Sequence, residues 1–108
     1  MDIDHIRATI ESDDYYGSIH FWDQLDARSI EIEQVLEAIG NGQIVQEMPT
    51  TGHDAECIVR GTVERSFGPL KLEHPLYVVL AFGELVTLIT ADWNEPREFG
   101  QKRERRRR

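Results

Sequence analysis

The chain has 108 residues, a formal net charge of −8 and 40% hydrophobic residues. This length suits one compact domain and excludes two. The single cysteine, Cys57, excludes an intramolecular disulfide and fits a reducing compartment. We find no basic start followed by an apolar run, and no apolar run of the roughly 20 residues that a membrane helix needs. We therefore expect a soluble, cytoplasmic protein that does not enter a membrane.

Charges are divided unevenly along the chain. Residues 1–101 carry 19 acidic and six basic side chains, whereas residues 102–108 carry one acidic and six basic side chains. We expect one domain over 1–101 and a disordered basic tail over 102–108. The acidic body repels nucleic acid, so phosphate binding has to come from the tail or from a local pocket. Lysine occurs only at Lys71 and Lys102, and this acid-rich composition resembles that of salt-adapted (halophilic) organisms.

The first half of the chain favours helices. Residues 1–12 place isoleucines at helical spacing, and "SDDYYGS" at 12–18 then breaks the pattern, with Gly17 as a hinge. A short helical or extended piece is expected over 20–27. The clearest helix follows Ser29, which is a good N-cap, and "GNG" at 40–42 ends it. Its apolar residues fall at i, i+3, i+4 and i+7, namely Ile32, Val35, Leu36 and Ile39.

The second half changes to the periodicity of strands. We expect four strands, over 43–48, 56–63, 76–82 and 85–91. Gly61 indicates a bulge in the second strand, and residues 65–75 form a loop that adds length to the hairpin. Gly83 and Glu84 fit a two-residue type II′ turn between the last two strands. Residues 76–82 are apolar on both faces and belong at the sheet centre. The predicted fold is α+β, with N-terminal helices packed on a four-stranded antiparallel sheet.

Several motifs follow one another at a recognisable spacing. The segment "IHFWDQLDARSIEIEQVLEAIGNGQIV" contains His20, Arg28, Ile30 and Gly42, and "CIVRGTV" contains Gly61. The strands "HPLYVVLAF" and "LVTLITADW" come next. Over residues 18–94 this order resembles the DUF4258 family, a group of bacterial and archaeal domains of unknown function. Through that family the chain also resembles toxins with the RelE/BrnT-type fold.

The chain departs from the DUF4258 pattern at three polar positions. Gln24 stands where the family has its first arginine, Tyr77 where it has a histidine, and Asp92 where it has a tyrosine. The resemblance implies a RelE/BrnT-like fold and points to RNA as the substrate class. It also implies an antitoxin-like partner protein whose charged segment covers the cleft.

Metal-independent RNA cleavage needs cations that hold the phosphate and an acid/base group near the 2′-hydroxyl and the leaving oxygen. We assign His20 as the acid/base group, Arg28 and Arg60 as phosphate clamps, and Tyr77 as a polar group directed at the same cleft. The prediction is a toxin-type RNA-cleaving or RNA-binding protein, and if it is an enzyme, an endoribonuclease that needs no metal or other cofactor.

A second interpretation needs no catalysis. His20 then supports the packing of the helix on the sheet, and Arg28 pairs with a nearby carboxylate such as Asp26 or Glu31. The chain would be a protein-interaction module of a salt-adapted organism, with a homodimer as one form and the sheet edge as its binding surface. The tail binds RNA or DNA phosphates under the first interpretation, and an acidic partner or the acidic body of another copy under the second. A third alternative is a disordered tail that only keeps the protein in solution.

Metal binding and base stacking have weaker signals. His53 and Cys57 form an "H-x3-C" pair, which supplies two ligands where a structural zinc site needs four, so we expect no metal. Cys57 lies in an apolar strand pattern, where its thiol stays protonated. The candidates for stacking on RNA bases are aromatic and dispersed along the chain, namely Trp22, Trp93 and Phe99.

Overall fold

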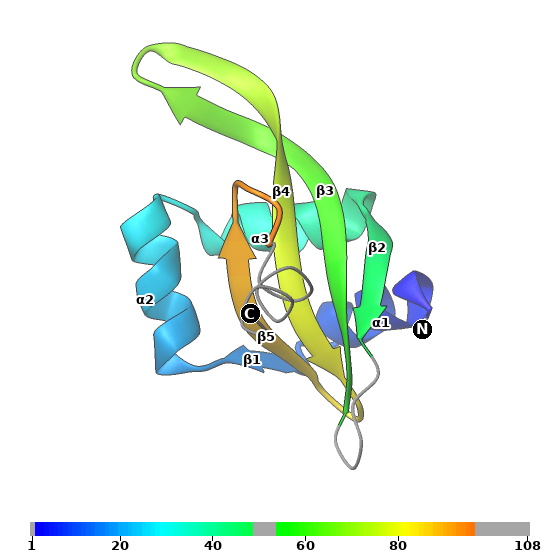
Figure 1. Ribbon diagram of the computed structural model, residues 1–108. Helices are drawn as coiled ribbons and strands as arrows, with labels where there is room; N and C mark the ends of the chain where they lie inside the picture. Colours follow the sequence, from blue (N-terminus) through cyan, green and yellow to red (C-terminus); the bar gives the residue numbers. More distant parts are fainter. Residues whose placement is uncertain (1, 49–53, 97–108) are drawn as a thin grey trace, which may run out of the picture.

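The computed structural model describes residues 2–48 and 54–96 of the chain. In these ranges three helices accompany a five-stranded sheet, so the fold is α+β, as predicted (Figure 1). The helices are α1 (Ile3–Glu11), α2 (Ile19–Arg28) and α3 (Ile32–Asn41). The strands are β1 (Tyr15–Gly17), β2 (Gln43–Met48), β3 (Ala55–Phe67), β4 (Leu70–Phe82) and β5 (Val86–Asp92). No helix in the described ranges is long and apolar enough to cross a membrane.

The core lies between the helices and one face of the sheet. Side chains alternate between the two faces of the sheet, so that every second side chain in the inner halves of β3 and β4 packs against the helices. The largest buried side chains of this layer are Ile6, Phe21, Leu25, Val35 and Ile39 from the helices and Val59, Val63, Leu76, Val78, Leu80 and Leu88 from the sheet. Strand β4 is the middle strand in the order β1-β5-β4-β3-β2, which confirms the central position predicted for residues 76–82.

The prediction of a four-stranded antiparallel sheet is wrong. Strands β2 to β5 form the expected antiparallel meander, but β1 adds a fifth strand parallel to β5, with Tyr15 opposite Val86 and Gly17 opposite Leu88. A three-residue strand is too short to leave a periodic signal, and the segment around it reads as a break. Because β1 ends at Gly17, it leaves residues 89–92 of β5 without a strand on that side. Helix α2 lies beside this stretch (Figure 1).

The loop predicted at residues 65–75 is instead the outer half of a long hairpin. Strands β3 and β4 each have 13 residues and stay paired as far as Phe67 and Leu70, with Gly68 in a left-handed conformation (φ 62°) at the turn. We call residues 63–74 the β3–β4 arm. The arm extends beyond the rest of the sheet on the side of the α2–α3 junction (Figure 1).

The bulge predicted at Gly61 is also wrong. The register between β3 and β4 runs through Gly61 without a shift, and the irregularity occurs in β2, between Ile44 and Gln46. Gly61 serves the packing of α3 instead. A Cβ on Gly61 would lie 2.5 Å from Cα of Ala38 and closer still to the Ala38 carbonyl oxygen. Only glycine lets α3 approach β3 this closely.

Two local predictions about chain reversals are wrong. Ser29 does not begin α3; it ends α2 in a left-handed conformation (φ 57°), which turns the chain between two consecutive helices. Glu31 begins α3 and forms a capping box with Gln34. The turn before β5 has three residues rather than two, because Phe82 pairs with Val86, and Gly83 does not take the positive φ that a type II′ turn requires.

Candidate functional site

Helix α2 presents a polar face to the uncovered stretch of β5. His20, Gln24 and Arg28 follow one another at four-residue steps, so they share one side of the helix. Phe21 and Leu25 are buried beside them and hold this side of α2 in place. The helix therefore aims three polar side chains toward the end of β5.

Arg28 joins α2 to the edge of β5. Its Nη1 donates to the Thr90 hydroxyl at 3.0 Å and to the Ala91 carbonyl oxygen at 2.7 Å, and it lies 3.7 Å from Oδ2 of Asp92. In the opposite direction, Nε1 of Trp93 donates to the Arg28 carbonyl oxygen at 2.9 Å. The guanidinium thus replaces a missing strand neighbour of β5. Its carboxylate partner is Asp92, and not Asp26 or Glu31 as the second interpretation suggested.

His20 is linked to the same strand through Gln24. Oε1 of Gln24 accepts hydrogen bonds from the Thr90 hydroxyl and, at 3.5 Å, from Arg28. The Gln24 amide nitrogen is then the donor in the 2.9 Å contact with Nε2 of His20. This assigns Nε2 of a neutral His20 ring as an acceptor and leaves the ring proton on Nδ1. These side chains line a cavity of about 210 Å³ together with Ile89, Asp92 and Pro96; we call it the α2–β5 cavity.

A row of polar side chains crosses the sheet next to this cavity. Arg60, Tyr77 and Asp92 are direct neighbours across β3, β4 and β5, on the face away from α3. Nε of Arg60 donates to the Tyr77 hydroxyl at 3.2 Å, and the guanidinium carbon lies 5.9 Å from the ring centre. His20 and Arg28 therefore share one cavity. Arg60 and Tyr77 do not line it, but lie in the row that reaches it through Asp92.

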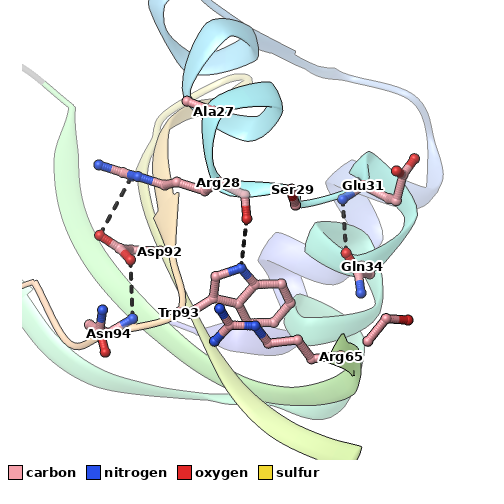
Figure 2. Close-up of a pocket in the computed structure, with 10 residues that line it drawn as sticks. Ala27, Arg28, Ser29, Glu31, Gln34, Arg65, Asp92, Trp93 and Asn94 are labelled. Atoms are coloured by element: carbon pink, nitrogen blue, oxygen red, sulfur yellow. Dashed lines mark hydrogen bonds and ion pairs between the residues drawn. The ribbon is translucent and has the colours of Figure 1, made fainter. Parts of the chain in front are cut away.

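A second cavity, of about 600 Å³, lies where the β3–β4 arm faces the α2–α3 junction. Figure 2 shows that Arg28, Trp93 and Arg65 line it, with the Trp93 indole between the other two. We call it the arm groove. Arg28 and Asp92 line both cavities, so their ion pair forms a shared wall. We assigned no role to Arg65 from the sequence. Had the β3 pattern been extended past Val63, the alternation of the strand would have placed Arg65 on the helix side.

One comparison with known proteins gives a match. A family model described as a domain of unknown function, DUF4258, matches residues 18–91. The chain belongs to the DUF4258 family. The match begins at Ser18, the N-cap of α2, and runs into β5, so it includes the polar face of α2 and the Arg60–Tyr77 pair. No curated protein and no solved structure matches the chain.

The stacking candidates of this DUF4258 domain differ in exposure. Trp22 is 41% exposed, whereas Trp93 is only 5% exposed, because it packs against His74 and Arg65. Trp93 is therefore not available to stack on a base, and its selection from the sequence is wrong. Phe99 and the tail at 102–108 lie outside the described residues. Within the described residues no three His, Cys, Asp or Glu side chains come close enough to hold a metal, and His53 lies outside them.

Cys57 is fully buried in β3 of the DUF4258 domain, on the side that faces the helices. Burial, with a smaller effect from the Glu47 carboxylate, raises the pKa of the thiol to about 11 from an ordinary value of 9.0. The thiol therefore stays protonated in the folded protein at neutral pH, as predicted from its apolar strand. A protonated, inaccessible thiol is a poor nucleophile and a poor metal ligand.

This raised pKa predicts a loss of stability in base. Below pH 9 the thiol is protonated in both the folded and the unfolded chain, so its ionisation does not change the free energy of unfolding. Between pH 9 and about 11 the unfolded chain loses this proton while the folded chain keeps it, so the free energy of unfolding falls as pH rises. We expect a loss of about 2–3 kcal/mol across this window, measured by urea unfolding. Cys57→Ala is the control, and an equally steep pH dependence in that variant would contradict the assignment.

Proposed function

We propose that this DUF4258 domain is a RelE/BrnT-type RNA-binding protein that holds an RNA phosphate at the α2–β5 cavity and cleaves the strand without a metal. The observation that supports the proposal is the arrangement of His20 and Arg28 in one cavity, next to a sheet row that contains Tyr77 and Arg60. An acid/base group and two cations thus lie along one continuous path across α2, β5, β4 and β3.

Arg28 can bind an anion while it holds β5. All the hydrogen bonds and the ion pair that its side chain forms with the described residues use Nη1, and 32% of that side chain is exposed. Nε and Nη2 therefore remain as donors for phosphate oxygens. Arg60 is exposed in the same row, and in this proposal it binds a neighbouring phosphate. Together with Asp92, these two arginines give the site a positive balance in a chain whose net charge is −8.

The proposed reaction uses the lone pair of His20 Nε2, which accepts from Gln24 in the free protein. Nε2 takes the proton of the RNA 2′-hydroxyl, and the 2′-oxygen forms a bond to phosphorus while the bond to the 5′-oxygen breaks. The leaving 5′-oxygen takes a proton from the Tyr77 hydroxyl, which regains one from water. The products are a 2′,3′-cyclic phosphate and a 5′-hydroxyl end, and the arginines stabilise the charge that develops on the phosphate.

The proposal is tested with a labelled single-stranded RNA in EDTA, at about 0.1 M and about 1 M KCl. We expect Arg60→Ala to weaken binding about fivefold to tenfold at low salt, through the loss of one phosphate contact. We expect His20→Ala to slow cleavage by a factor of about 10² to 10⁴ while binding changes little. Lys71→Ala is the matched control for Arg60→Ala, because it removes one charge at an exposed position on the β3–β4 arm.

Equal losses of binding in Arg60→Ala and Lys71→Ala would indicate unspecific attraction and contradict a site at the row. If the unaltered chain binds RNA without cleaving it, and His20→Ala binds RNA equally well, the enzymatic part of the proposal is contradicted. Absence of binding at both salt concentrations would favour the second candidate, a non-catalytic interaction module of a salt-adapted organism. The observation that favours this candidate is the exposed apolar surface of the β3–β4 arm.

A further inference from the structure

The β3–β4 arm has three large apolar side chains that are exposed to solvent. Phe67, Leu70 and Leu72 are 41%, 61% and 53% exposed. The register places them on one face, because Phe67 pairs with Leu70 and Leu72 pairs with Arg65. This face is the continuation of the helix side of the sheet, but the arm extends past the helices. The result is an apolar strip with Arg65 at its inner end, where the arm groove begins.

Arg65 is held in place by rings. Its guanidinium carbon lies 4.5 Å from the centre of the Trp93 ring and 4.8 Å from that of Phe67, and its Nη1 lies 3.5 Å from Nε2 of His74. Stacking between two aromatic rings orients the planar guanidinium and keeps its edge available for hydrogen bonds. Figure 2 shows the Arg65 guanidinium against the Trp93 ring. The cation is therefore positioned before any ligand arrives.

No carboxylate of the described residues neutralises Arg65. Two carboxylates line the arm groove, and both have other partners: Asp92 pairs with Arg28, and Glu31 belongs to the capping box of α3. Arg65 forms no ion pair within the described residues, although the chain has 20 acidic side chains. An oriented guanidinium in a groove, without an anion of its own, is suited to a carboxylate from outside.

The size and charge of this surface favour one kind of ligand. Three half-exposed side chains of roughly 200 Å² each present on the order of 300 Å² of apolar surface, far less than the ~800 Å² per partner of a stable dimer. A strand of RNA would meet a second carboxylate here, because Glu31 lines the groove together with Asp92. RNA bases stack on aromatic rings, and two of the three side chains of the strip, Leu70 and Leu72, have none. A short protein segment satisfies both the apolar strip and the single cation.

We propose that the arm groove is a docking site for an extended segment of a partner protein. In this segment one carboxylate side chain pairs with Arg65, and large apolar side chains next to it cover Phe67, Leu70 and Leu72. The proposal goes beyond RNA binding and does not depend on it. Because Arg28 and Asp92 line both cavities, a docked segment contacts one wall of the α2–β5 cavity.

The test is a selection of short randomised peptides displayed on phage against the full chain, followed by fluorescence anisotropy with the best synthetic peptide. We expect enriched peptides in which Asp or Glu lies beside Leu, Ile or Phe. Arg65→Gln, and separately Leu70→Ser with Leu72→Ser, should each weaken binding at least about tenfold. His20→Ala and Arg60→Ala, which test the RNA site, should leave peptide binding unchanged.

Arg65→Lys serves as the second variant, because it keeps the charge and loses the planar fork, and we expect it to weaken binding as well. Circular dichroism and the urea midpoint establish that each variant is folded. The proposal is overturned if no such motif is enriched, or if the peptide binds folded Arg65→Gln as well as the unaltered chain. Loss of RNA binding alone in Arg65→Gln would make the groove an RNA subsite. If the unaltered chain is a dimer and the double variant Leu70→Ser with Leu72→Ser is a monomer, the strip is a contact between copies of the chain and the proposal is overturned.

Discussion

Gly61→Ala is expected to cost about 3 kcal/mol of unfolding free energy or more, or to prevent folding. The added Cβ would lie 2.5 Å from Cα of Ala38, so α3 would have to move away from β3. Backbone cannot yield as a flexible side chain does, and the helix supplies Val35 and Ile39 to the core. Urea unfolding followed by circular dichroism measures the loss.

Gly40→Ala is the matched control for this substitution. Gly40 lies within α3, and a Cβ there meets nothing within 4 Å. We expect this variant to gain about 0.5–1 kcal/mol, because alanine loses less backbone entropy than glycine in a helix. A loss below about 1 kcal/mol in Gly61→Ala would show that α3 shifts easily, and would contradict the role of Gly61 as a contact point.

Arg28→Ala is expected to lower the free energy of unfolding by about 2 kcal/mol. The substitution removes the donor of the Ala91 carbonyl and of the Thr90 hydroxyl, and leaves the half-buried Asp92 carboxylate without its cation. The same variant should lose RNA binding by more than the tenfold limit expected for Arg60→Ala, because it removes a clamp and loosens α2 from β5. Urea unfolding and the RNA assay measure the two effects separately.

Asp92→Asn measures how much the ion pair of Arg28 contributes to stability, because it removes the charge of the partner and keeps the hydrogen bonds of Arg28 to Thr90 and Ala91. The pair is 3.7 Å long and about a third of each side chain is exposed, so we expect Asp92→Asn to cost less than about 1 kcal/mol. If Arg28→Ala costs no more than Asp92→Asn, the bonds to Thr90 and Ala91 add nothing to stability. That outcome would contradict the view that Arg28 replaces a strand neighbour at the edge of β5.

Local patterns in the sequence were enough to predict the features that depend on a few neighbouring residues. The apolar spacing from Ile32 to Ile39 predicts α3, and the doubly apolar run at 76–82 predicts the middle strand. The apolar pattern around Cys57 predicts a protonated thiol. Periodicity carries this information because a helix or strand repeats its geometry every few residues. The shared side of His20 and Arg28 was not determined in this way, because the sequence left residues 20–27 as helical or extended and the structure shows the helix.

The residues that lie opposite these elements could not be predicted in this way, because they depend on how the whole domain packs. The partner of Arg28 is Asp92, 64 positions later, because the short β1 leaves that end of β5 uncovered. The place of Arg65 between two rings depends on how far β3 and β4 stay paired, which the loop-like composition of 65–75 conceals. Such pairings depend on which edges and faces remain open once the sheet has formed. The spacing of residues within one segment does not show which edges and faces remain open. A contact between distant residues therefore cannot be predicted from that spacing alone.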